Sequence, residues 1–197
     1  MLQLLSLITP ICKGFLTELG VEAANLGLQV LGGHGYIRES GMEQNVRDSR
    51  ISTIYEGTTG IQALDLLGRK VLGSRTKLLQ PLLKSLFDYA RSLQRHQSMC
   101  WCVAPLNEAL QIWQSCTATV ADSAVGDADE VGAAAHDYLM ISGYAMLAYL
   151  WARMASVAEH KMADGCLDES FYRAKIHTAQ FYFKRILPRI YTHNAAL

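Results

Sequence analysis

The segment QVLGGHGYIRESGMEQNVRDSRISTIYEGTTGIQ, residues 29–62, indicates where the chemistry of this chain lies. It contains two glycine turns, a cluster of charged residues, and one carboxylate, Glu56, set between Tyr55 and Gly57 just before an apolar helical run. A carboxylate in such a place can serve as a general base. Closely spaced glycines let a phosphate-bearing cofactor approach the backbone. We therefore expect the functional site here and helical scaffold elsewhere.

The composition of the 197-residue chain predicts a large core and no strong electrostatic field. Half of the residues are apolar, 18% are charged, and the formal net charge is zero. This balance argues against nucleic acid or an anionic membrane surface as a partner. Proline is scarce, helix-forming residues are plentiful, and no segment has the period of a strand. The predicted fold class is all-α, built from antiparallel helical bundles.

Apolar residues at spacings of three and four divide the chain into helices. The first covers Met1–Leu31, with Thr9 as a cap before Pro10 and Gly20 as a bend or division, and it stops at Gly32-Gly33. Residues 34–55 are expected to be irregular or short-helical. A helix from about Gly60 to Lys70 follows, capped by Thr58 or Thr59. Later helices are predicted near residues 77–96, from Pro105 to Val120, and over 129–162 and 169–187, with residues 121–128 as a connection.

Gly73-Ser74-Arg75-Thr76 is the best candidate for a domain boundary. We expect residues 1–74 to form part of one helical domain and residues 75–197 an additional helical domain. The short connections between successive helices favour an antiparallel arrangement.

Cysteine, histidine and hydropathy patterns predict no metal site and no membrane span. The scattered cysteines are expected to be reduced thiols in a cytoplasmic protein: Cys12, Cys100, Cys102, Cys116 and Cys166. The histidines form no ligand-spaced set. The longest uncharged stretch, Tyr138–Ala152, is 15 residues long. It is shorter than the roughly 20 residues that cross a bilayer, so we expect a buried helix. The apolar N-terminus is interpreted in the same way.

Three segments, QVLGGHGYIRES, VRDSRISTIYEGTTGIQ and ALDLLGRK, resemble the C-terminal helical domain of the acyl-CoA dehydrogenases. The family pattern is Q-[VI]-x-G-G-x-G-Y, then R-D-[AS]-[RK]-I, then I-Y-E-G-T-x-x-I-Q, in this order and at this separation. From about Leu78 the chain is similar to the extra helical domain of the longer bacterial members, which include enzymes resembling 3-methylmercaptopropionyl-CoA dehydrogenase. Together the two resemblances cover nearly the whole chain.

The resemblance implies an FAD-dependent enzyme that converts an acyl-CoA to a trans-2-enoyl-CoA and passes electrons to an electron-transferring flavoprotein. Glu56 matches the glutamate that removes the α-proton, and Tyr55 and Gly57 are the expected substrate contacts. In a dry acyl pocket, burial would raise the pKa of such a base. The implied FAD contacts, usually made across a dimer interface for the first three, are Gln29, Gly32, Gly33 and Thr58.

Other positions of the motif have structural interpretations. Gly60 stands where many members have glutamine, so a side-chain contact made by that glutamine is in doubt here. Arg47 and Asp48 match the R-D pair and are interpreted as ion pairing that holds the loop before Glu56, with a substrate contact as the alternative. His34 occupies a variable position in the turn.

Complete family members carry an N-terminal helical domain and a central β-domain ahead of this region. The isolated chain is therefore expected to be inactive, to bind FAD weakly or not at all, and to associate into a homodimer or higher oligomer through exposed apolar faces. Two alternatives stay open: a non-catalytic helical module for oligomerisation, interaction or membrane docking, and a portion of an acyl-CoA oxidase.

Overall fold

The computed structural model describes residues 2–165 and 167–197, and these contain helices and turns but no strand, which confirms the all-α fold class. The α-helices are α1 (Leu2–Val30), α2 (Gly33–Tyr36), α3 (Met42–Arg50), α4 (Thr59–Leu64), α5 (Leu79–Leu93), α6 (Cys100–Gly126), α7 (Glu130–Ala163), α8 (Glu169–Phe181) and α9 (Ile190–Ala196). The short 3₁₀ and π segments are η1 (Arg38–Ser40), η2 (Ile51–Thr53), η3 (Asp65–Leu72), η4 (Gln97–Met99), η5 (Tyr182–Ile186) and η6 (Leu187–Arg189).

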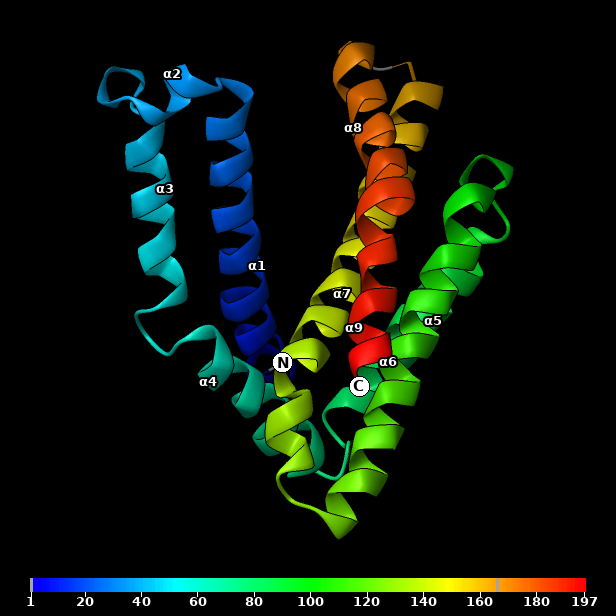
Figure 1. Cartoon of the computed structure of the whole chain (residues 1–197). Helices are drawn as coiled ribbons and strands as arrows, with labels where there is room; N and C mark the ends of the chain where they lie inside the picture. Colours follow the sequence, from blue (N-terminus) through cyan, green and yellow to red (C-terminus); the bar gives the residue numbers. More distant parts are fainter. Residues whose placement is uncertain (1, 166) are drawn as a thin grey trace.

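The helices form two arms that meet near α4 (Figure 1). One arm is an antiparallel hairpin of α1 and α3, closed at its far end by α2. The other arm contains α5 to α9, in which α6 and α8 run antiparallel to the long helix α7. α7 begins beside α4 and packs against α1, so it belongs to the contact between the arms as well as to the second arm.

Glycines allow α1 and α7 to approach closely where they cross. A Cβ at Gly143 would lie 2.1 Å from the Phe15 ring, and one at Gly14 would lie 2.6 Å from a methyl group of Leu139. The buried Phe15 ring also meets Tyr144 edge-on, with 5.0 Å between ring centroids. Side chains on one helix therefore fill space that the other helix leaves open.

A hydrogen-bonded aromatic group stabilises the centre of the second arm. Trp113 of α6 donates to the hydroxyl of Tyr138 at 3.1 Å, and the Thr117 hydroxyl lies 2.8 Å from the same oxygen. Tyr182 donates to the Tyr144 carbonyl at 2.8 Å. Burial raises the pKa of the Tyr138 and Tyr182 hydroxyls above their ordinary value. Buried polar groups are thus satisfied within the core.

The turn predicted as a domain boundary contains two non-glycine residues with positive φ, Arg75 at 50° and Thr76 at 59°. Buried residues on both sides of it, such as Leu67 and Leu83, belong to one continuous hydrophobic cluster that also includes Leu139 of α7. The division into residues 1–74 and 75–197 stays a prediction.

The predicted helices are confirmed, but several of their ends are wrong. Pro10 lies inside α1, not in its first turn, and Gly20 does not divide that helix. α6 begins at Cys100 instead of Pro105 and continues to Gly126, so most of the expected connection is helical. Pro188 does not end the last helical run, because η6 contains it and α9 follows.

The described cysteines are free thiols; Cys12 and Cys100 are exposed, whereas Cys102 and Cys116 are buried. Cys166 lies outside the described residues. Among the described helices, α1 has the length and apolar composition of a membrane span. The core helix of a soluble protein has the same properties, and Leu7, Ile11 and Phe15 of α1 are buried in the core. The absence of a membrane span stays a prediction.

Candidate functional site

A strained turn between η2 and α4 carries the predicted base. Glu56 has a φ of 53° and Gly57 a φ of 90°, so two consecutive residues lie in the left-handed region. Glycine is favoured at the second position, because a φ of 90° strains any residue with a side chain, and a Cβ there would also lie 2.8 Å from Nε2 of Gln62. That side-chain nitrogen donates to the Glu56 carbonyl at 3.2 Å. The chain leaves the turn through Thr58, whose hydroxyl accepts from the Ile61 backbone N–H at 3.4 Å as the N-cap of α4.

Two side chains of α1 hold this turn in place. The Lys13 ammonium donates to the Gly57 carbonyl at 2.5 Å, and the buried Thr59 hydroxyl donates to Oε1 of Glu18 at 2.5 Å. Hydrogen bonds to a charged group are stronger than neutral ones. The backbone that follows Glu56 is therefore fixed relative to α1, whereas the Glu56 side chain forms no ion pair with a described residue.

The immediate surroundings of Glu56 are open. Both Glu56 and Tyr55 are exposed, the latter at 52%, and Thr58 is exposed as well. The dry pocket expected around the base is thus not formed by the described residues alone. The structure brings Tyr55, Glu56, Gly57 and Thr58 together on one turn.

The other predicted cofactor residues lie at the opposite end of α1. Gln29 is in the last turn of that helix, and its carbonyl accepts from the Gly32 N–H at 3.0 Å. Gly32 has a φ of 57°, and Gly33 begins α2. Lys13, which contacts Gly57, precedes Gln29 by 16 positions on the same helix. At the rise of an α-helix this is about 24 Å. Within one chain the two predicted contact regions are therefore separate.

A groove of about 700 Å³ lies beside the glycine turn, between α1 and α3. It includes Tyr36, which is 77% exposed, and the cationic side chains of Arg38 and Arg47. A Cβ built on Gly33 would meet no atom within 4 Å, so packing inside this chain does not explain that glycine.

The charged residues of α3 pair mainly within that helix. Arg47 bonds Glu43 at 2.9 Å and Gln44 at 2.5 Å, and Asp48 accepts from Gln44 at 2.8 Å. The predicted ion pairing is confirmed for Arg47, whereas Asp48 forms no ion pair with a described residue, and neither side chain reaches the Glu56 turn. Arg50, which donates to the Thr53 hydroxyl, is the nearer link.

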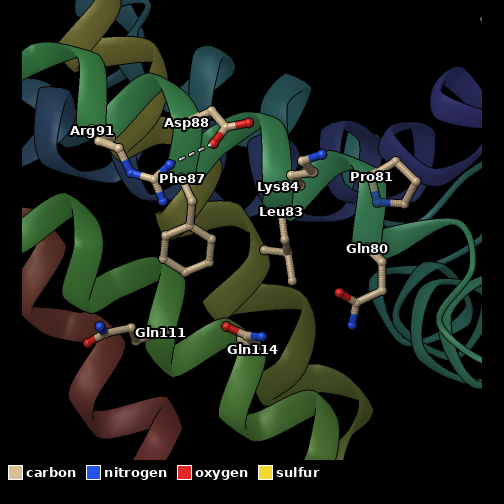
Figure 2. A pocket seen from close by; sticks show the side chains of 9 residues that line it. All are labelled: Gln80, Pro81, Leu83, Lys84, Phe87, Asp88, Arg91, Gln111 and Gln114. Atoms are coloured by element: carbon tan, nitrogen blue, oxygen red, sulfur yellow. Dashed lines mark hydrogen bonds and ion pairs between the residues drawn. The ribbon is translucent and has the colours of Figure 1, made fainter.

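A larger groove, of about 860 Å³, lies between α5 and α6 and contains no residue of the Glu56 turn (Figure 2). No group of three potential metal ligands occurs among residues 2–165 and 167–197. The candidate site therefore consists of the Tyr55–Thr58 turn and the separate glycine turn after α1.

Sequence reasoning did not identify the residues that position the site. Lys13, Glu18 and Arg38 belong to no part of the motif that was assigned a role. Only their contacts in the folded chain reveal them. Gln62 ends the recognised motif, and its bond to the Glu56 carbonyl gives that position a physical reason.

Comparison with known families agrees with this geometry. The family described as acyl-CoA dehydrogenase, C-terminal domain, matches residues 4–72, and the family described as acetyl-CoA dehydrogenase C-terminal like matches residues 82–197. The turn with Glu56 falls within the first match and the α5–α9 arm within the second. The chain belongs to the acyl-CoA dehydrogenase family, of which it carries C-terminal helical regions.

Individual relatives extend over most of the chain. It is 35% identical over 181 residues, 91% of its length, to 3-methylmercaptopropionyl-CoA dehydrogenase of Ruegeria pomeroyi. It is 30% identical over 190 residues, 92% of its length, to the broad-specificity linear acyl-CoA dehydrogenase FadE5 of Mycobacterium tuberculosis. A butyryl-CoA dehydrogenase of Syntrophomonas wolfei is 24% identical over 185 residues, 92% of this chain and 30% of that protein. The chain spans 31% of the length of each of the first two relatives.

Proposed function

We propose that the chain is the C-terminal portion of an FAD-dependent acyl-CoA dehydrogenase in which Glu56 is the catalytic base. The observation that carries the proposal is the turn itself. It holds Glu56 in a left-handed conformation, with the Glu56 carbonyl bonded to Gln62 of α4 and the Gly57 carbonyl bonded to Lys13 of α1, and the Glu56 carboxylate forms no ion pair with the described residues. A base needs a fixed backbone and an unengaged carboxylate.

In the proposed reaction the Glu56 carboxylate takes the α-proton of an acyl-CoA thioester. The Cα–H bond breaks, the β-hydrogen leaves with its electron pair, and a Cα=Cβ double bond forms. Bound FAD would supply the hydride acceptor, and an electron-transferring flavoprotein would later take the two electrons. Gly57 and Tyr55, which flank Glu56 in the chain, are the proposed substrate contacts, and the Gln62 amide occupies the space that a side chain at Gly57 would take.

The residues present fit part of a flavin dinucleotide site. The Gly33 backbone is unobstructed, and the adjoining groove contains Arg38, a cation that suits phosphate oxygens, together with Arg47, which is paired with Glu43. Gln29 and Gly32 belong to the same turn, whereas Thr58 follows Gly57, which contacts Lys13, about 24 Å from Gln29 along α1. We propose that two copies of the protein contribute these two regions to different cofactor molecules, which makes a homodimer or higher oligomer necessary.

The test of the base is Glu56→Gln in the intact polypeptide that contains this chain. Removing a general base lowers turnover by about 10²- to 10⁴-fold. The variant should retain its flavin absorption and lose exchange of the substrate α-proton with D₂O. Glu108→Gln, an exposed glutamate on α6, is the matched control and should keep wild-type turnover. Turnover retained in Glu56→Gln would remove Glu56 as the base.

The isolated chain should lack dehydrogenase activity, because its described residues leave Glu56 exposed. The check is a visible absorption spectrum after incubation with FAD and gel filtration. A flavin spectrum that stays with the protein, together with turnover of an acyl-CoA, would contradict this expectation.

Free thiols suit a reducing compartment, and we extend the proposal to a cytoplasmic location.

A further inference from the structure

A third groove, of about 450 Å³, lies between the C-terminal half of α7 and the first turns of α8. It is far from the Glu56 turn, because α7 meets α1 at Leu139–Gly143 and the groove begins further along the helix. Its lining residues are Leu150, Arg153, Met154 and Val157 of α7 and Phe171, Tyr172 and Lys175 of α8.

The floor of this groove is apolar and accessible. Val157 is 55% exposed, Phe171 49%, Leu150 41% and Met154 39%. The α7 members lie four and three residues apart, so they form one stripe on the helix. A contiguous apolar patch with a charged border marks an interaction surface more often than ordinary solvent-facing surface.

Two cations border the floor. The Arg153 guanidinium lies 5.6 Å from the centre of the Tyr149 ring, and the Lys175 ammonium lies 5.0 Å from the centre of the Phe171 ring. Neither cation forms an ion pair with any residue that the structure describes, whereas Arg173 on the same helix is paired with Glu169. The free positive charges are held beside aromatic rings, where they can meet an incoming carboxylate.

The groove between α5 and α6 provides a contrast (Figure 2). It also carries two cations, Lys84 and Arg91, but Asp88 lies 3.4 Å from Arg91. Three glutamine side chains line it as well: Gln80, Gln111 and Gln114. The polar lining of that groove suits contact with water. The two grooves both contain two cations, so the α7/α8 groove differs from it in having an apolar floor and no carboxylate beside its cations.

We propose that the α7/α8 groove binds an acidic amphipathic helix of a partner protein. Two antiparallel helices form a trough in which a third helix can lie, with apolar anchors at i, i+3 or i+4, and i+7 on the exposed floor. Carboxylates that flank those anchors would reach Arg153 and Lys175. Because no carboxylate among the described residues pairs with these cations, the groove is complementary in charge to an acidic helix.

Other occupants fit less well. A lipid surface contacts apolar side chains on a crest, whereas these side chains line a hollow between two helices. A second copy of this chain would have to supply an acidic apolar helix. Helix α1 exposes several leucines, but it carries no aspartate or glutamate before Glu18, and the acidic groups of α3 bond within that helix.

The experiment uses fluorescein-labelled helical peptides of about 18 residues with leucines at groove spacing and glutamates on both flanks. Fluorescence anisotropy with the wild-type chain should show saturable binding of the acidic peptide and none of a version with lysine in place of glutamate. Arg153→Glu with Lys175→Glu should weaken binding by about tenfold or more. Circular dichroism verifies that the double variant is folded.

The matched control is Lys84→Glu with Arg91→Glu, the same charge change in the groove of Figure 2, and it should leave peptide affinity unchanged. Equal binding of acidic and basic peptides by the wild-type chain would overturn the proposal without need of any variant. The proposal would also fail if the acidic peptide does not bind while phosphatidylserine vesicles do, or if the groove variant abolishes self-association instead of peptide binding.

Discussion

At the turn before α4, Glu56 and Gly57 both have positive φ, and the conformational free-energy cost differs between the two residues. A non-glycine residue in the left-handed region costs about 1–2 kcal/mol, so Glu56 is held there by its surroundings. Gly57 has no such penalty, and its missing Cβ leaves room for the Gln62 amide. The strain at Glu56 is maintained by bonds to its own carbonyl and to that of Gly57.

Gly57→Ala should destabilise the chain by about 1–3 kcal/mol, because the added Cβ is strained at this φ and collides with Gln62. Urea unfolding followed by circular dichroism measures the effect. Gly60→Ala is the matched control three residues away. A Cβ there meets no atom within 4 Å, and the change should be neutral or stabilise by up to about 1 kcal/mol. Equal effects at both positions would contradict the role given to the turn.

Local patterns in the sequence predicted the start of the helix that follows this turn, but they did not predict the side chains of α1 that hold the turn in place. A threonine before an apolar run, Thr58 or Thr59, predicts an N-cap, and the structure shows that Thr58 is the capping residue. Lys13 and Glu18 come from a helix more than 40 positions earlier, so no local pattern connects them to the turn. Local patterns could not predict that Glu56 is exposed either, because the burial of a side chain depends on which surfaces pack together in the fold.

Among the helices, the contact of α1 with α7 depends on small residues. Gly143→Ala should destabilise the chain by about 1–3 kcal/mol, because its Cβ would overlap the buried Phe15 ring and separate the two helices. Gly132→Ala in the first turns of α7 meets no atom and should be neutral or stabilising. Thermal unfolding of both variants gives the comparison. Loss of stability in Gly132→Ala alone would refute the close-packing explanation.

Helix periodicity predicted each long helix, but three helix ends that were predicted from prolines are wrong. Pro10 is accepted inside α1, where the Thr9 hydroxyl donates to the Leu5 carbonyl at 2.7 Å and where Pro10 and Ile11 are buried. α6 starts before Pro105 because Cys102 and Val103 pack in the core. Tertiary burial outweighed local propensity at these positions.

At the scale of the whole molecule, the core contains a thiol and tyrosine hydroxyls that are uncharged in the folded state. Burial raises the pKa of the Cys102 thiol from 9.0 to about 11. The folded state therefore binds more protons than the unfolded state between these values, and stability is full below about pH 9 and falls as pH rises through 11. Burial raises the pKa of Tyr138 and Tyr182 as well, so they add to the loss.

Cys102→Ala should reduce this alkaline loss of stability by an amount on the order of 2 kcal/mol. Urea unfolding at about pH 8 and about pH 10.5 measures it. Cys100→Ala, an exposed thiol two positions earlier on α6, is the control and should keep the wild-type pH dependence. An unchanged slope in Cys102→Ala would show that this thiol does not contribute.

Helix α7 is 34 residues long, and it is continuous from the start of the second arm to the α7/α8 groove. From Ile141, at the crossing with α1, to Val157 in the groove the helix rises about 24 Å. A tilt of about 5° at the crossing would thus displace the groove by about 2 Å. α1 also holds the Glu56 turn through Lys13 and Glu18. A change in the angle between α1 and α7 at the Gly14 and Gly143 crossing would therefore move the Glu56 turn and the α7/α8 groove relative to each other.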